Sequence, residues 1–362
     1  MRKRFKGPRM WGVILILVMV VGVIGVIVRW FAPFEERTAE QFPWGISAAL
    51  NMFCGLSVAA GAFSVAATLW ASRIETYKPI LRASLLIGYA GFLTAFVSAC
   101  LQHKFRWHIL SALWSPRSIP AGALVAFAIY TVALAAEVLP ISIFTKRYRR
   151  AHEWIRYTGM LVTCVAAVLA ARQQVSFVEL LRVAPASFSP MWVTPMLPVH
   201  LYFSALCVSV ALIIFAYWRV TVATGKAIAR ECFDGLSKAF LVLLLVTLGA
   251  RMLDITDTGQ WRNLLHNHLY DYLFGLEVVL YLAPVLFLLN RHRSDYVLVY
   301  DCSVLVIAGF LVNRLNTLIT SREVIVGYAF VARASDMAAA VAIIAAAIAM
   351  FSWLSKRLPV FA

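Results

Sequence analysis

Charged residues are scarce in this chain of 362 residues. They make up 14% of the sequence, whereas hydrophobic residues make up 62%. A soluble domain carries about a quarter charged residues, so this composition excludes an ordinary water-soluble protein. The segments between the apolar runs are also too short to build a second, water-soluble domain. The composition therefore predicts an integral membrane protein.

Residue patterns that hold cofactors are missing as well. The six cysteines are scattered, and no two have metal-ligand spacing, which argues against an iron–sulfur cluster or a zinc site in this chain. The sequence has no glycine-rich nucleotide loop, covalent-haem motif or nucleophile motif. A transmembrane b-type haem usually needs two axial histidines within facing helices, and only His200 lies within an apolar run. We therefore expect no haem and no metal in this chain, so that a redox role would need an external electron donor.

What the sequence does contain is a series of apolar runs long enough to cross a bilayer, which takes about 20 residues. They predict an all-α, polytopic membrane protein with about ten transmembrane helices in a single membrane domain over residues 1–362. A weak similarity between spans two to five and spans six to nine favours two four-helix bundles plus flanking helices. The predicted spans are Met10–Phe31, Ile46–Trp70, Ala83–Leu101, Ala121–Pro140, Ile155–Ala171, Leu197–Trp218, Leu236–Ile255, Tyr272–Asn290, Val297–Asn313 and Ser335–Leu354.

The basic residues predict the orientation of these spans. The net charge is +16, and its two densest clusters, within residues 1–9 and 146–150, fall on the same side of the membrane. The first loop on the opposite side is acidic, as the positive-inside rule requires. We expect a bacterial inner-membrane protein with a basic cytoplasmic N-terminus, a retained first span and a cytoplasmic tail over residues 355–362. The excess of Lys and Arg over acidic residues then reflects membrane topology and contact with anionic lipids rather than nucleic-acid binding.

Ionisable residues inside the apolar runs mark a candidate site, because a charge there is costly unless it is paired, hydrated or used. Arg251 and Asp254 share one face at the outer end of the seventh span, and Glu277 lies in the outer half of the eighth. A structural ion pair between helices is the alternative for Arg251 and Asp254. Four further polar residues come from span ends at similar depth, namely Asn51, His200, Arg314 and Asn316.

A second carboxylate, Glu137, lies near the cytoplasmic end of the fourth span. It follows Tyr130 by about two helical turns, and Asp301 enters the ninth span at comparable depth. A carboxylate at this depth is a candidate for proton uptake from the cytoplasm. The alternative is a helix-end glutamate that reaches the basic loop at residues 146–150.

Residues 189–198 read Ser-Pro-Met-Trp-Val-Thr-Pro-Met-Leu-Pro and precede Ser204-Ala205 at the start of a predicted span. Four further segments stand out over spans four to nine, namely Leu134–Val138, Leu248–Asp254, Gly275–Val278 and Val312–Thr317. In their sequence and their order, these segments resemble motifs of the NrfD / polysulfide reductase membrane-subunit family, and within it the HybB-type branch of nickel–iron hydrogenase 2.

This resemblance implies a haem-free subunit that exchanges electrons between a periplasmic, ferredoxin-like iron–sulfur subunit and the membrane quinone pool. The bound substrate would be menaquinone or ubiquinone, and the catalytic partner an oxidoreductase such as a nickel–iron hydrogenase. The resemblance also implies a proton route through Glu137, and Tyr130 and Asp301 are candidates for further residues of this route. The residues implied at or near the quinone pocket are Arg251, Asp254, Glu277, His200, Trp192, Arg314 and Asn316, with Asn51 and His103 as further candidates.

The chain departs from the family pattern at two places. Residues 101–106 read Leu-Gln-His-Lys-Phe-Arg, with no carboxylate where the family has an Asp-x-Gly-Arg-Pro-like turn, and His103 is the candidate replacement for a proton donor there. The family's His-Gln pair at the end of the fifth span is Arg172-Gln173. Two other functions stay open at this point. One is a secondary transporter, and the other is a non-catalytic membrane anchor for a periplasmic oxidoreductase, which would not need Glu137.

Overall fold

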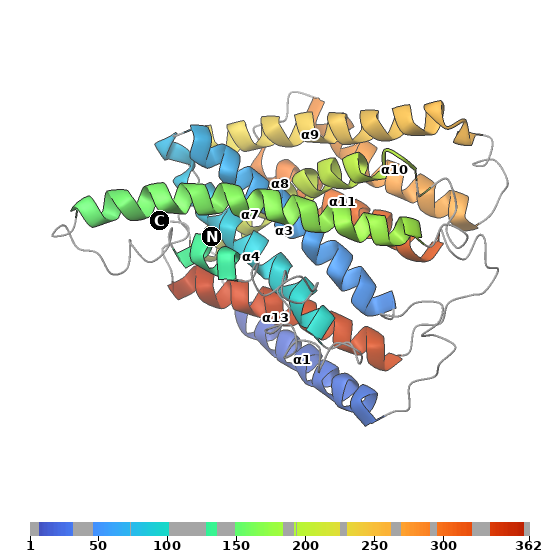
Figure 1. Ribbon diagram of the computed structural model, residues 1–362, viewed down its shortest axis with the longest axis horizontal. Coiled ribbons are helices and arrows are strands. Elements are labelled where there is room, and N and C mark those ends of the chain that lie inside the picture. The colour runs from blue at the N-terminus through green and yellow to red at the C-terminus, as the bar shows by residue number, and fades with distance from the viewer. Residues whose placement is uncertain are drawn as a thin grey trace.

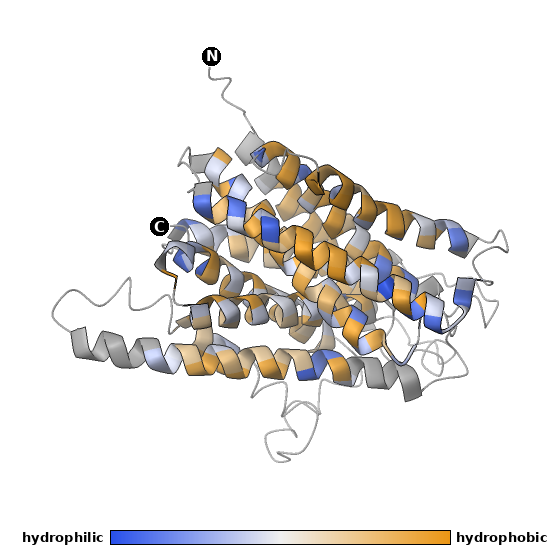
Figure 2. Cartoon of the chain, turned by 90° about the horizontal axis from the view of Figure 1, so that it is seen from above, coloured by the Kyte–Doolittle hydropathy of each residue, from blue (hydrophilic) through white to orange (hydrophobic). Residues whose placement is uncertain are grey.

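The chain folds into long apolar helices, as its composition predicts. The computed structural model describes residues 7–31, 46–72, 74–100, 128–135, 149–183, 192, 194–224, 230–261, 269–289, 295–320 and 334–357. In these ranges the long elements are helices, and no β-strand occurs. Eight of the described helices are long and apolar enough to cross a membrane. Figure 2 shows that hydrophilic residues gather toward the helix ends. The prediction of an all-α, polytopic membrane protein is confirmed.

The helices lie side by side in one bundled array (Figure 1). A short helical stretch over residues 128–135 represents the predicted fourth span. The long helices are α1 (Gly7–Phe31), α3 (Ile46–Ser72), α4 (Lys78–Cys100), α7 (Arg149–Val183), α8 (Leu197–Thr224), α9 (Arg230–Asp257), α10 (Leu269–Leu289), α11 (Tyr296–Leu315) and α13 (Ala334–Arg357).

Two apolar cores divide most of these helices into two four-helix bundles. The first core joins α3, α4, the stretch 128–135 and α7 around Phe63, Phe92 and Tyr130. The second joins α8, α9, α10 and α11 around residues such as Phe240 and Val306, and it also contacts the inner sides of α3 and α4. We name these the N-terminal and C-terminal bundles. Their presence, with α1 and α13 outside them, matches the arrangement predicted from the sequence.

The two bundles meet where α3 crosses α8. A Cβ atom built on Gly61 of α3 would overlap the carbonyl group of Ala205 in α8 and lie 2.5 Å from the Ser209 hydroxyl. Small residues permit such close approach of helix backbones in membrane proteins, where packing rather than hydrophobic burial drives association. Gly61 therefore fixes how closely the two bundles can pack.

The helices α1 and α13 form a flanking pair. Gly22 of α1 lies against Ala338 and Ala342, whereas Gly25 faces Ser335 one to two turns earlier in α13. The two helices are therefore antiparallel, and the start of α1 lies at the same end of the molecule as the end of α13. Many valine, leucine and isoleucine side chains of α1 are exposed, as expected for a helix that faces lipid.

Several helices extend a few residues beyond the predicted spans, and the difference is largest for α7. The fifth span was predicted over residues 155–171, but α7 runs for 35 residues through the polar sequence at 172–174. The helix continues because Gln173 accepts a hydrogen bond from the Tyr130 hydroxyl and the Gln174 amide nitrogen donates to Ser57, so both polar side chains find a partner inside the bundle. The ninth span, predicted over 297–313, passes at Leu315 directly into a π-helix, Asn316–Thr320.

We expect Gly61→Ala to destabilise the protein and Gly249→Ala to leave it unchanged or slightly more stable. The first substitution forces two helix backbones apart, and overpacking of this kind costs about 1–3 kcal/mol. A Cβ on Gly249 of α9 meets nothing within 4 Å, and alanine favours a helix over glycine. Thermal unfolding of the detergent-purified variants measures both effects. Equal melting temperatures for the two variants would contradict the close crossing of α3 and α8.

Candidate functional site

The ionisable residues gather at one end of the C-terminal bundle. At this end α8 and α10 begin, whereas α9 and α11 end, because consecutive helices are antiparallel. Asp254 and Arg251 thus come from the last turns of α9, and His200 comes from the first turn of α8. Glu277 follows the start of α10 by about two turns. We name this region the His200 end of the bundle.

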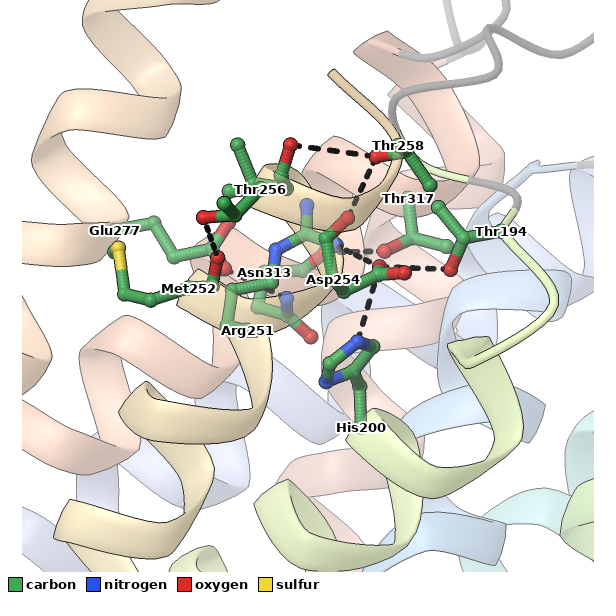
Figure 3. A network of polar contacts seen from close by, with 11 residues as sticks. Thr194, His200, Arg251, Met252, Asp254, Thr256, Thr258, Glu277, Asn313 and Thr317 are labelled. Atoms are coloured by element: carbon green, nitrogen blue, oxygen red, sulfur yellow. Dashed lines mark hydrogen bonds and ion pairs between the residues drawn. The ribbon is translucent and has the colours of Figure 1, made fainter. Parts of the chain in front are cut away.

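Asp254 is the centre of a buried polar cluster (Figure 3). Its Oδ2 atom accepts a hydrogen bond of 2.8 Å from the Thr194 hydroxyl and lies 3.0 Å from Nε2 of His200. Nη1 of Arg251, one turn earlier on α9, lies 3.8 Å from the same oxygen. One carboxylate oxygen therefore brings together α8, α9 and the turn that precedes α8.

The turn before α8 explains why Thr194 reaches this cluster. The backbone N–H of Leu197 donates to the carbonyl oxygen of Thr194, and the N–H groups of Val199 and His200 donate to Met196. Pro195 provides no backbone donor, so the chain turns sharply into the helix at this point. This turn brings both Thr194 and His200 to the Oδ2 atom of Asp254.

Arg251 lies between two aromatic rings. Its guanidinium carbon is 5.2 Å from the ring centre of Trp192 and 5.6 Å from that of Phe274. The two rings meet edge to face, with 5.8 Å between their centres, and Ile255 completes a small apolar cluster. Cation–π attraction holds the charge of Arg251 in place without using its hydrogen-bond donors.

Several nitrogen atoms in this cluster have no hydrogen-bond partner within the described part of the chain. They are Nε and Nη2 of Arg251 and both ring nitrogens of His200, of which Nε2 has only the ion-pair contact with Asp254. Both residues are less than 10% exposed. A buried polar group without a partner costs about 1–3 kcal/mol. In a native protein such a group calls for a specific explanation, such as a functional role. These nitrogens can be satisfied by a ligand that carries oxygen atoms.

Glu277 forms a second cluster next to the first. Its Oε1 atom accepts from the amide of Asn313 at 2.8 Å, and its Oε2 atom accepts from Asn316 at 2.9 Å. The Asn316 amide also lies 3.3 Å from the carbonyl oxygen of Leu273. Asn316 opens the π-helix that follows α11, and π-helical turns are frequent at functional sites. Glu277 and Phe274 share one face of α10, so α10 contributes to both clusters.

Arg314 lies deeper than the other charged residues. It is 0% exposed, and its guanidinium carbon is 4.6 Å from the ring centre of Phe53 and 4.5 Å from that of Phe310. Its Nη2 atom approaches the hydroxyls of Ser57 and Ser204 at 3.1 and 2.9 Å and the Leu201 carbonyl at 3.3 Å, and Nη1 donates to Asn313 at 2.6 Å. These contacts surround the Arg314 side chain, although its Nε atom has no hydrogen-bond partner within the described residues. Its place at or near the quinone pocket stays a prediction.

The structure brings together only some of the predicted residues. Asn51 is buried, but its amide donates to the Ala340 carbonyl of α13 and does not join either cluster. Tyr130 lies in the N-terminal bundle, whereas Asp301 is exposed near the start of α11. His103 and Glu137 lie outside the described residues.

Several uncharged residues that contact the buried charges were not predicted from the sequence, because the prediction of the site started from charged residues. Thr194 and Ser204 belong to the segments that carry the family resemblance, and Asn313 precedes Arg314 in another of them. The motif itself was therefore the available signal for these three residues. Phe274 and Ser57 carried no such signal. Within the described residues no group of three His, Cys, Asp or Glu side chains could hold a metal ion.

Comparison with known proteins shows the family to which this chain belongs. A protein of Nitratidesulfovibrio vulgaris is 20% identical over 358 residues, which cover 95% of this chain and 92% of the relative. A probable Ni/Fe-hydrogenase 2 b-type cytochrome subunit of Escherichia coli is 20% identical over 327 residues, which cover 88% of this chain and 83% of the relative. The model of the family described as polysulphide reductase, NrfD, matches residues 35–332. This match covers most of the chain, which therefore belongs to the NrfD family, as its motifs predict.

Proposed function

We propose that this chain exchanges electrons between an iron–sulfur subunit and the membrane quinone pool. Membership of the NrfD family makes it a membrane subunit of a respiratory oxidoreductase, related to a hydrogenase membrane subunit. The proposal that quinone binds here rests on one observation. Arg251 and His200 have nitrogens without hydrogen-bond partners in the described residues, and Arg251 lies beside the rings of Trp192 and Phe274. A catalytic oxidoreductase of the nickel–iron hydrogenase type, which the name of the Escherichia coli relative indicates for that protein, would then supply or receive the electrons.

The chemistry of a quinone matches this set of groups. A quinone head has a flat, largely apolar ring and two carbonyl oxygens that accept hydrogen bonds. Nε and Nη2 of Arg251 are fixed donors, because an arginine side chain is always protonated. The apolar ring would lie near Trp192 and Phe274, whose own edge-to-face contact leaves apolar surface around the guanidinium group. Menaquinone and ubiquinone share these features.

His200 and Asp254 provide a proton acceptor for the same ligand. The Asp254 carboxylate faces Nε2 of His200, so in the neutral imidazole the proton lies on Nε2 and Nδ1 is free to accept. Oxidation of a quinol releases two electrons and two protons. Nδ1 would take one proton from a quinol hydroxyl, and Asp254 would stabilise the resulting imidazolium, as a carboxylate does in other acid–base pairs. The Glu277 carboxylate in the adjacent cluster would take the second proton, and the two electrons would pass to the iron–sulfur subunit. Reduction of a quinone runs the same steps in reverse.

The position of the site suits electron exchange with a separate subunit. Both polar clusters lie at one end of the bundle. A bound quinone head would therefore be close to the surface where an iron–sulfur subunit can dock. We infer that this end faces the periplasm and that both termini lie in the cytoplasm of a bacterium, from the distribution of basic residues. If this end of the bundle faced the cytoplasm, the membrane would separate the site from a periplasmic electron donor.

Arg251→Met should lower quinone-linked turnover of the intact complex at least about ten-fold, because one lost hydrogen bond to a buried ligand corresponds to about that factor. Activity with a water-soluble dye, which takes electrons before they reach the membrane, should stay unchanged. Arg219→Met, an exposed arginine of α8 at the other end, is the matched control and should keep both activities. Normal quinone turnover in Arg251→Met would remove Arg251 from the proposed site.

We also propose that the chain carries no haem. His200 is committed to Asp254, and ligation of a b-type haem usually needs a second histidine on a facing helix. The word cytochrome in the name of the Escherichia coli relative belongs to that protein. An absorption spectrum of the purified, reduced chain should lack the paired bands of a b-type haem. Their presence at one haem per chain would overturn this part of the proposal.

A proton route from the cytoplasm would connect quinone chemistry to energy conservation. We propose Glu137 and Tyr130 as parts of this route, on the strength of the family resemblance and of the buried Tyr130–Gln173 hydrogen bond. Asp301 is the second candidate for the cytoplasmic entrance. The apolar side chains of Val306 and Phe310 separate it from the His200 end along α11, so the N-terminal bundle offers the more polar path.

We expect Glu137→Gln to reduce turnover with quinone without dissociating the complex, because glutamine cannot exchange a proton. Glu231→Gln, which changes an exposed glutamate at the start of α9, is the control and should leave turnover with quinone unchanged. Asp301→Asn tests the other entrance in the same assay. Full activity of Glu137→Gln with the native quinone would exclude this residue from proton transfer.

A further inference from the structure

A continuous series of polar contacts runs from the N-terminal bundle to Glu277. Gln174 of α7 approaches the Ser57 hydroxyl of α3 at 3.4 Å, and the same hydroxyl lies 3.1 Å from Nη2 of Arg314 in α11. Nη1 of Arg314 then donates to Asn313 at 2.6 Å, and Asn313 donates to Glu277 at 2.8 Å. Four helices from both bundles are joined in this way by buried or partly buried side chains.

The chemistry of Arg314 fixes the direction of these hydrogen bonds. An arginine side chain only donates, whereas an asparagine amide has one accepting and one donating end. Because Arg314 donates to Oδ1 of Asn313, the NH₂ group of Asn313 must face Oε1 of Glu277. On the other side, the Leu273 carbonyl accepts from Nδ2 of Asn316 and orients that amide in the same sense. Both oxygens of Glu277 therefore accept N–H groups.

Arg314 acts on the site through these hydrogen bonds and through the Coulomb attraction between its charge and the Glu277 carboxylate. Its side chain is 0% exposed and packs between two phenylalanine rings. A buried charge in a membrane protein is rare and usually functional. Arginine also differs from lysine here, since only its planar fork can reach the amide on one side and two hydroxyls on the other at the same time. The fork is thus matched to Asn313, Ser57 and Ser204.

We infer that Arg314 is a positioning residue that orients Asn313 and, through it, the proton-exchanging carboxyl group of Glu277. Ser57 and Ser204 hold the guanidinium from the first helix of each bundle, so the packing of α3 against α8 sets the place of Glu277. This inference rests on the proposed function for the role of Glu277 in proton exchange beside the quinone site. The orientation of Glu277 itself does not depend on quinone binding.

Infrared difference spectroscopy between acidic and alkaline pH tests this inference in the purified full-length chain, without turnover. The carbonyl band that Glu277→Gln lacks belongs to protonated Glu277. We expect Asn313→Asp and Arg314→Lys to shift this band, because both alter the hydrogen bonds to the carboxyl group. Asn51→Asp, which changes a buried amide outside the series, should leave the band in place.

Quinone kinetics of the assembled complex give a second readout. A positioning role predicts that Arg314→Lys lowers kcat by about ten-fold with little change in KM, since an interaction needed for the chemical step is lost. If Arg314→Lys fails to assemble, Asn313→Asp and Asn313→Leu decide the question, because they change the contact between Arg314 and Glu277 and leave the guanidinium group in place.

The outcomes separate this inference from the proposed function. A Glu277 band that stays unchanged in Arg314→Lys and Asn313→Asp overturns the positioning role, and so does a spectrum in which Glu277→Gln lacks no band. A shifted band supports the positioning role even if no variant affects quinone turnover, and that result would count against the quinone site instead. A shifted band together with a lower kcat supports both.

Discussion

Four charges buried at one end of an apolar bundle are the constraint on which the rest of this structure depends. Arg251, Asp254, Glu277 and Arg314 are each less than 10% exposed. In a low-dielectric interior each of them needs partners, because an uncompensated charge is strongly destabilising. The partners come from other helices, so the ends of α8, α9, α10 and α11 have to lie in one fixed arrangement. Nitrogens of Arg251, His200 and Arg314 have no hydrogen-bond partner within the described residues. Those of Arg251 and His200 flank the Asp254 carboxylate, where we propose that a ligand binds.

The two bundles are joined by the same arrangement. Gly61 allows α3 and α8 to approach closely, and Arg314 then bonds to a serine from each of these two helices. Packing and electrostatics therefore act at the same crossing. A change in the distance between the bundles would move Arg314, then Asn313, and finally the carboxyl group of Glu277. In this way an apolar contact deep in the molecule supports the geometry of a polar site.

The sequence predicted the spans well because their signal is simple, since every backbone polar group in a membrane must be satisfied within a helix. It also placed Arg251, Asp254 and Glu277 at one depth. Depth does not give direction around a helix, however, and Asn51 faces α13 although it lies at a similar level. Thr194 and Asn313 are uncharged, so nothing in their composition marks them as partners of a carboxylate. The length of α7 was underestimated because Gln173 and Gln174 find their partners only in the folded bundle.

Labelling of the purified complex with a photoreactive quinone analogue tests the central claim most directly. The account predicts covalent adducts on the segments that carry Trp192 to His200, Arg251 to Asp254 and Phe274, with competition by the native quinone and loss of labelling in Arg251→Met. Labelling confined to the N-terminal bundle or to the flanking pair of α1 and α13 would contradict it.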